Sequence, residues 1–144
     1  MSIDWPNTHP FPGLALVALG ASFELQGARA ARTVAAGDFF TLPSADATRE
    51  NVLQPGELLT AIVLPPPAPG ARSTYTDVRE RPGFDWPLVA LAASVRAEGG
   101  LVRQASLVLG AVAPIPWRVA AAEQALVGQK LDAAGAQRAA EAAV

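Results

Sequence analysis

The sequence predicts an α+β fold in which an antiparallel sheet of three or four strands is covered by C-terminal helices. Two runs with strand character, residues 88–97 and 101–112, are separated by Gly99-Gly100, the pair that a tight hairpin turn requires. The prolines of Pro114-Ile115-Pro116 then end the strand pattern, and alanine and leucine at helical spacing follow. We therefore expect a strand-to-helix corner at this double proline.

Length, charge and cysteine content narrow the class of protein. The 144 residues suffice for one domain, or for one small domain and part of another. The eleven Lys and Arg residues are scattered and the formal net charge is −2, which argues against a nucleic-acid-binding face. No cysteine is present, so the chain itself forms no disulfide, thiolate zinc site or iron–sulfur cluster.

The first half is predicted to contain the end of a helix and three strands. Residues 14–19 read as the last turns of a helix that Gly20 ends, and they are too short to span a bilayer. Residues 22–26 alternate polar and apolar side chains, as a half-buried strand does, and residues 32–34 form its partner. Residues 58–64 are apolar on both faces, which predicts a strand that is central in its sheet or packed on two sides.

Between these strands, residues 37–43 are predicted to form a short helical turn, with Phe39 and Phe40 as a local core. Residues 44–51 are polar and expected to be solvated. With no basic N-terminal region and no membrane-spanning segment, we expect a soluble, cytoplasmic protein.

The second half begins at residues 65–70, a proline-rich connector that marks the one candidate domain boundary. Residues 71–78 are strand-like, with Tyr75 as the anchor. Residues 117–127 are predicted to form a helix with one apolar face and a stop at Gly128, and residues 132–143 a second helix. The apolar face of the first helix consists of Val119, Ala122 and Leu126.

Few residues carry the potential for chemistry. His9 is the only histidine and is expected to be a loop residue, because no second histidine or cysteine gives a metal-site spacing. Residues 79–86 concentrate charges and aromatic rings. This loop is either a solvated connection with Phe84 or Trp86 folded onto the core, or a cofactor-binding loop.

A resemblance to a known family favours the cofactor-binding loop. Four segments carry this resemblance: AAGDFFTLP (35–43), TRENVLQPGELLTAIVLPPP (48–67), VRERPGFDWPLV (78–89) and GAVAPIPWR (110–118). In order and spacing they resemble the C-terminal part of the FAD-binding medium subunits of molybdenum hydroxylases. Members of this family include xanthine dehydrogenase, aldehyde oxidoreductase and carbon monoxide dehydrogenase.

The resemblance implies a domain organisation and a role. Residues 1–64 would end a FAD-binding domain, 65–70 would be the connector, and 71–144 would form a truncated domain similar to the C-terminal domain of the carbon monoxide dehydrogenase flavoprotein. The implied partners are a molybdopterin-binding large subunit and an iron–sulfur small subunit. Electrons would pass from the iron–sulfur clusters through FAD to NAD or another acceptor, with no catalytic side chain on this chain and no activity of the chain alone.

The resemblance also implies cofactor-binding positions at Leu59, Asp77 and Arg79. Leu59 matches a strand position that packs on the flavin, and Arg79 lies in the cofactor loop. Asp77 stands where the family has a lysine, and its negative charge would repel a diphosphate.

Two further departures concern the flavin itself. Phe11-Pro12 replaces the family's Ser-Asp, whose aspartate binds the flavin, and the 144 residues contain no counterpart of the glycine-rich first half of the FAD domain. Two alternatives therefore stay open: a non-catalytic interaction module, or a degenerate remnant that no longer binds FAD.

Overall fold

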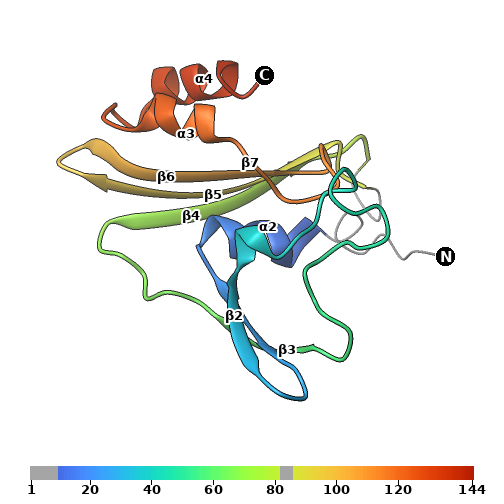
Figure 1. Ribbon diagram of the computed structural model, residues 1–144. Helices are drawn as coiled ribbons and strands as arrows, with labels where there is room; N and C mark the ends of the chain where they lie inside the picture. The colour runs from blue at the N-terminus through green and yellow to red at the C-terminus, as the bar shows by residue number, and fades with distance from the viewer. Residues whose placement is uncertain (1–9, 82–85) are drawn as a thin grey trace.

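Two antiparallel sheets lie on either side of one helix in the computed structural model, which describes residues 10–81 and 86–144 (Figure 1). The first sheet has the order β2-β1-β3 and the second the order β4-β5-β6-β7. The strands are β1 (Ser22–Gln26), β2 (Ala31–Ala35), β3 (Leu58–Val63), β4 (Ala71–Val78), β5 (Val89–Glu98), β6 (Leu101–Gly110) and β7 (Trp117–Arg118). The helices are α2 (Pro10–Ala18), the 3₁₀ turn η1 (Ala36–Asp38), α3 (Ala120–Leu126) and α4 (Ala133–Glu141). The predicted α+β class is confirmed.

Helix α2 is the element that the two sheets share. Its sequence, PFPGLALVA, is apolar on nearly every side, as expected for a helix covered on two faces. Leu14 and Ala18 pack on β5 and β6, while Leu16 and Val17 pack against the core of the first sheet. The helix ends as predicted at Gly20, whose φ of 69° is accessible to glycine at little cost.

The first sheet has a small aromatic core. Phe23 and Leu25 of β1 are buried against Ala36 and Phe39, and the rings of Phe23 and Phe39 meet edge to face with centroids 4.8 Å apart. Phe40 packs against Phe39 in the same geometry, which confirms the predicted local core. The helical turn is shorter than predicted, because only residues 36–38 adopt it.

The prediction that residues 58–64 form a strand that is central or packed on two sides is wrong. β3 is an edge strand that pairs only with β1 among the described residues, and most of its side chains are exposed. The apolar pattern on both faces is real, but among the described residues no strand pairs with the outer edge of β3.

The second sheet follows the predicted hairpin. Gly99 and Gly100 have φ angles of 61° and 77°, which confirms the tight turn between β5 and β6. One face of the sheet packs on α2. The opposite face packs on α3 and α4 through a second buried cluster: Val102, Ala105, Val119, Ala122, Leu126 and Ala139.

The double proline does not lead straight into a helix, so the predicted corner is corrected. After Pro116 the chain stays extended, and Trp117 and Arg118 pair with Leu109 and Val108 as β7. This short strand occupies part of the outer edge of β6, whose backbone groups would otherwise lack partners. The helix begins only at Ala120, three residues later than predicted, with the predicted apolar face buried.

Candidate functional site

The three cofactor positions implied by the sequence lie on different elements. Leu59 is in β3, opposite Leu25 of β1, and its side chain is partly exposed at the edge of the first sheet. Asp77 is near the end of β4, opposite Ala90, and Arg79 follows that strand. Asp77 and Arg79 are therefore neighbours, whereas Leu59 belongs to the other sheet.

Asp77 and Arg79 form a tight ion pair. Oδ2 of Asp77 accepts hydrogen bonds from Nη2 of Arg79 at 2.7 Å and from Nε at 3.1 Å. Both side chains are only about one-fifth to one-quarter exposed, at 21% and 24%. Because the pair is electrically neutral, it offers no net positive charge to a diphosphate.

Tyr75 lies two residues before Asp77 on the same face of β4. Its ring packs against the cluster that joins α2 to the second sheet. Burial, reinforced by the charge of Asp77, raises the pKa of the Tyr75 phenol. Tyr75 therefore stays protonated at neutral pH and anchors the strand, as its predicted role requires.

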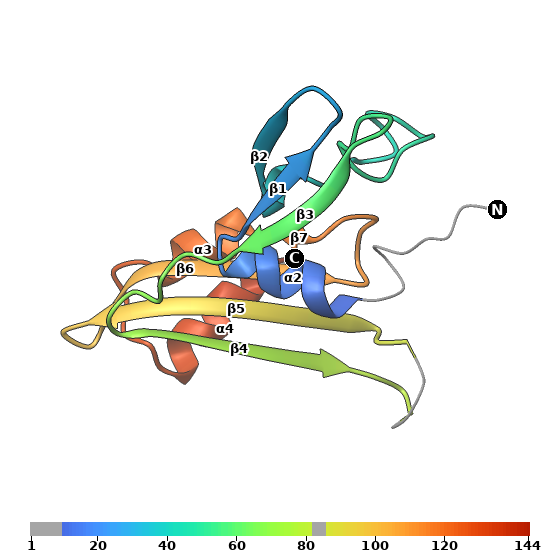
Figure 2. The ribbon, with the colours of Figure 1, turned by 90° about the horizontal axis from the view of Figure 1, so that it is seen from below.

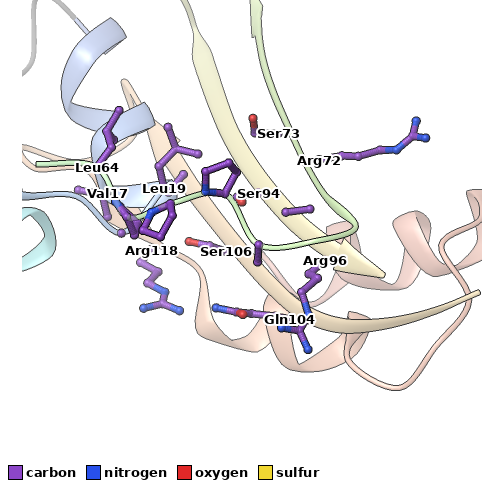
Figure 3. A pocket seen from close by; sticks show the side chains of 17 residues that line it. Val17, Leu19, Leu64, Arg72, Ser73, Ser94, Arg96, Gln104, Ser106 and Arg118 are labelled. Atoms are coloured by element: carbon purple, nitrogen blue, oxygen red, sulfur yellow. The ribbon is translucent and has the colours of Figure 1, made fainter. Parts of the chain in front are cut away.

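A cavity of about 590 Å³ lies elsewhere, between the end of α2, the proline connector and the second sheet (Figure 3). One wall is apolar and is formed by residues 17–20 and 64–68. The sheet contributes Ser73, Ser94 and Ser106, which are in register on three adjacent strands. Their small side chains leave open the space beneath the connector.

The lining of this cavity is cationic. Arg72, Arg96 and Arg118 line it, and no carboxylate does among the described residues. In Figure 3 the side chain of Arg72 extends away from the row of serines. Arg118 donates from Nε to Oε1 of Glu123 at 2.8 Å, and this hydrogen bond raises the pKa of Arg118. Glu123 balances the charge of Arg118, so the net positive charge of the lining comes from Arg72 and Arg96.

Sequence reasoning missed this cavity. The three serines are far apart along the chain, and only the strand register brings them together. None of Leu59, Asp77 and Arg79 is among the described residues that line the cavity. The cavity and the implied cofactor positions are therefore separate features.

Several expectations concern residues that the structure does not describe. His9 and Phe84 lie outside the described ranges, while Trp86, the other aromatic residue proposed as a lid, is described and is exposed. Over residues 10–81 and 86–144, no group of three or more His, Asp or Glu side chains is placed to hold a metal ion. In the same ranges, no helix has the length and apolar character needed to cross a bilayer.

Comparisons with known proteins give two family matches in chain order. A model described as the FAD binding domain in molybdopterin dehydrogenase matches residues 12–67. A model described as the CO dehydrogenase flavoprotein C-terminal domain matches residues 73–144.

Individual relatives agree with these matches. The aldehyde oxidoreductase FAD-binding subunit PaoB of Escherichia coli is 37% identical over 95 residues, which are 66% of this chain and 28% of that protein. The carbon monoxide dehydrogenase medium chain of Afipia carboxidovorans is 37% identical over 114 residues, 79% of this chain and 38% of that protein. The chain thus spans less than half the length of these relatives.

Solved structures show the same relation. The crystal structure of the Cu,Mo-CO dehydrogenase in its cyanide-inactivated form contains a chain that superposes with a TM-score of 0.82 at 32% identity. The match covers 96% of this chain and 46% of the other. Quinoline 2-oxidoreductase from Pseudomonas putida 86 gives a TM-score of 0.79 at 27% identity, with the same two coverages.

Proposed function

Since the chain belongs to the FAD-binding medium subunits of molybdenum hydroxylases, we propose that it forms the C-terminal half of a flavin-carrying electron-transfer subunit. The observation that carries this proposal is the pair of family matches in chain order. The fold supports it, because 96% of this chain superposes on part of a carbon monoxide dehydrogenase chain. The proposed division is residues 1–64 as the end of the FAD-binding domain, 65–70 as the connector and 71–144 as the C-terminal domain.

The proposed partners are a molybdopterin-binding large subunit and an iron–sulfur small subunit in a cytoplasmic enzyme similar to carbon monoxide dehydrogenase, aldehyde oxidoreductase or xanthine dehydrogenase. FAD, when bound, supplies the redox chemistry that would pass electrons to NAD or another acceptor. This chain has no side chain that needs to act as an acid or base in that step. The contribution of this chain is to position FAD and to shield it.

The described residues meet only part of what FAD requires. The partly exposed Leu59 fits an apolar contact with a flavin ring. The diphosphate needs backbone N–H groups or unpaired cations, and the neutral Asp77–Arg79 pair supplies neither. We therefore propose that Leu59 faces the flavin, that Arg79 lies beside the cofactor with its charge largely cancelled, and that the diphosphate donors come from the preceding half of the subunit.

A chimeric subunit tests this function. In it, the segment of the Afipia carboxidovorans medium chain that matches this chain is replaced by this chain, so that the preceding half is supplied by the relative. We expect the purified chimera to carry bound FAD with a flavin absorption band, and the chain alone to be colourless. A folded, soluble chimera without flavin would contradict the proposal.

A second candidate is an interaction module that keeps the fold without carrying flavin. The specific observation that favours it is the Asp77–Arg79 ion pair, because an aspartate at this position cancels the charge that a cofactor loop would offer. The replacement of the family's Ser-Asp by Phe11-Pro12 points the same way. A colourless but folded chimera that still assembles with the other subunits would support this candidate.

A further inference from the structure

The cavity beneath the proline connector lies away from the cofactor positions implied by the sequence. Figure 2 shows the connector between β3 and β4 passing the end of α2 and reaching the second sheet where β4 begins. Ser73, which lines the cavity, precedes Asp77 by four residues along β4. At about 3.3 Å per residue, the two positions are separated by roughly 13 Å. The cavity is therefore a place for a ligand other than the cofactor.

The floor of the cavity is the polar part of a sheet face that is otherwise apolar. Ser94 lies two residues after Ala92, which is buried beneath α2, so both side chains are on one face of β5. The same face continues with Arg96, which is paired in register with Gln104 of β6. Where α2 no longer covers the sheet, hydroxyl, guanidinium and amide groups thus replace apolar side chains.

The opposite wall of the cavity is apolar. Leu19, Leu64 and residues 65–67 line it, and the two leucines are 38% and 54% exposed. In Figure 3, Leu19 and Leu64 lie on one side of the row of serines. Arg96 and Gln104 lie on the other side of that row. The cavity therefore combines an apolar end with a polar, cationic end, which matches an amphipathic ligand.

Arg96 is the cation best placed to receive an anion there. The ion pairs recorded among the described residues are made by other arginines: Arg32, Arg79 and Arg118. Arg96 therefore has no carboxylate partner within that part of the chain. Arg72 extends away from the serines, which leaves one guanidinium for one negative charge. A guanidinium binds a carboxylate through two parallel N–H···O hydrogen bonds, so a monocarboxylate fits better than a polyphosphate.

The end of α2 sets the orientation of such a ligand. Residues 17–20, which line the cavity, are the last turn of α2 and the residues that follow it. The carbonyl end of a helix carries partial negative charge and disfavours an anion beside it. The side chains of Arg96 and Gln104 offer N–H donors at the other end. The anionic group would therefore lie at these donors, and the apolar body beneath Leu64 and the connector.

We propose that this cavity binds a small amphipathic monocarboxylate, with its carboxylate at Arg96 and Gln104 and its apolar body between the connector and the end of α2. The volume of about 590 Å³ falls within the range of about 300–1,000 Å³ that is usual for small-molecule pockets. The serine row gives the ligand a floor of small side chains with hydroxyl groups. The site goes beyond the proposed function and does not require bound FAD.

Two probes of equal shape test the role of charge. The isotope-labelled chain is titrated with cinnamate and with cinnamamide, which lacks the negative charge, and backbone amide resonances are followed by NMR. We expect cinnamate to shift the resonances of Ser94, Arg96 and Ser106 and to leave those of Phe23 and Leu25 in place. Its Kd should be at least about tenfold lower than that of cinnamamide. Equal affinities, or shifts confined to other residues, would overturn the proposal.

Two matched variants test the place of binding. Arg96→Gln and Arg103→Gln each remove one positive charge from the β5–β6 hairpin, and Arg103 is exposed and does not line the cavity. We expect Arg96→Gln to raise the Kd for cinnamate at least about tenfold and Arg103→Gln to leave it unchanged. Equal effects would indicate long-range attraction and overturn the site. Ser94→Val fills the floor with a residue that suits a strand, and should weaken binding of both probes; unchanged binding would also count against the cavity.

The chimeric subunit tests whether the cavity is open in a longer chain. We expect cinnamate to bind the chimera with the same Kd, whether or not the chimera carries flavin. Loss of binding would show that the preceding half fills the cavity, and displacement of cinnamate by FAD would assign the cavity to the cofactor. Either result would overturn the proposal. A colourless chimera that binds cinnamate would contradict the proposed function alone.

Discussion

Leu14 of α2 and Gly110 of β6 lie in such close contact that a Cβ atom on Gly110 would come within 3.1 Å of Leu14 Cδ2, and closer still to Cδ1. Leu14 is buried in the cluster that also contains Ala90 and Val108. The contact therefore connects the helix that precedes the first sheet to the second sheet. It fixes the two parts of the chain against each other on either side of the proline connector.

Gly110→Ala should destabilise this contact. The added methyl group cannot be accommodated without displacing Leu14 in a packed core, so we expect a loss of about 1–3 kcal/mol in the free energy of unfolding. Urea denaturation measures the change. In a double-mutant cycle with Leu14→Ala, the combined loss should be smaller than the sum of the two single losses, and strict additivity would show that the two residues do not constrain each other.

The Arg32–Glu57 pair should make stability depend on acid pH. Hydrogen bonds from Arg32, and then from the backbone N–H of Gln54, lower the pKa of Glu57 from 4.5 to about 2. A group with a lowered folded-state pKa stabilises the protein above its unfolded pKa, and that contribution is lost as the pH falls through the folded pKa. We expect the melting temperature to fall between about pH 4.5 and 2.

Glu57→Gln is the control for this dependence. The glutamine side chain does not titrate in this range. The melting temperature of the variant should therefore be lower than that of the unsubstituted chain at neutral pH, and the two melting temperatures should converge near pH 2. Parallel curves over the whole range would show that Glu57 contributes nothing to the acid transition.

Much of the fold was predictable because local signals and tertiary structure agree. The doubled glycine at 99–100, the alternation in residues 22–26 and the apolar face of Val119, Ala122 and Leu126 each require one conformation, and each has it. The strand β7 was not predictable, because its two residues are extended only through pairing with Leu109 and Val108. No local pattern encodes that pairing.

The site was less accessible to sequence reasoning. The cavity depends on the register of Ser73, Ser94 and Ser106, which no spacing along the chain reveals. The apolar pattern of β3 was recognised correctly, but among the described residues the strand pairs on one edge only, so the predicted position in the sheet was wrong. Asp77 and Arg79 were candidate cofactor positions by sequence. Only the structure shows that the two side chains form an ion pair with each other.

Glu123→Ala should weaken the junction of β6, β7 and α3. Oε1 of this buried carboxylate accepts from the backbone N–H of Leu107 at 2.9 Å and from Arg118 Nε at 2.8 Å. Its removal leaves the Leu107 N–H without this acceptor, and we expect a loss of about 1–3 kcal/mol by urea denaturation. Glu123→Gln keeps an acceptor for Leu107 and should cost less. An equal loss in both variants would indicate that the ion pair with Arg118, and not the backbone contact, is what matters.

Asp77→Asn should strengthen flavin binding in the chimeric subunit if Arg79 lies beside the cofactor. The amide keeps the size of the side chain but removes the charge that Asp77 places beside Arg79, so the local potential at an anionic group near Arg79 becomes more favourable. For a partly exposed pair this is worth about 0.5–1 kcal/mol, which corresponds to about a two- to fivefold lower Kd for FAD. A fluorescence titration at two salt concentrations measures it, and the gain should shrink at high salt. Glu80→Gln removes a charge three residues further along and controls for net charge, so an equal gain in that variant would place Arg79 away from the diphosphate.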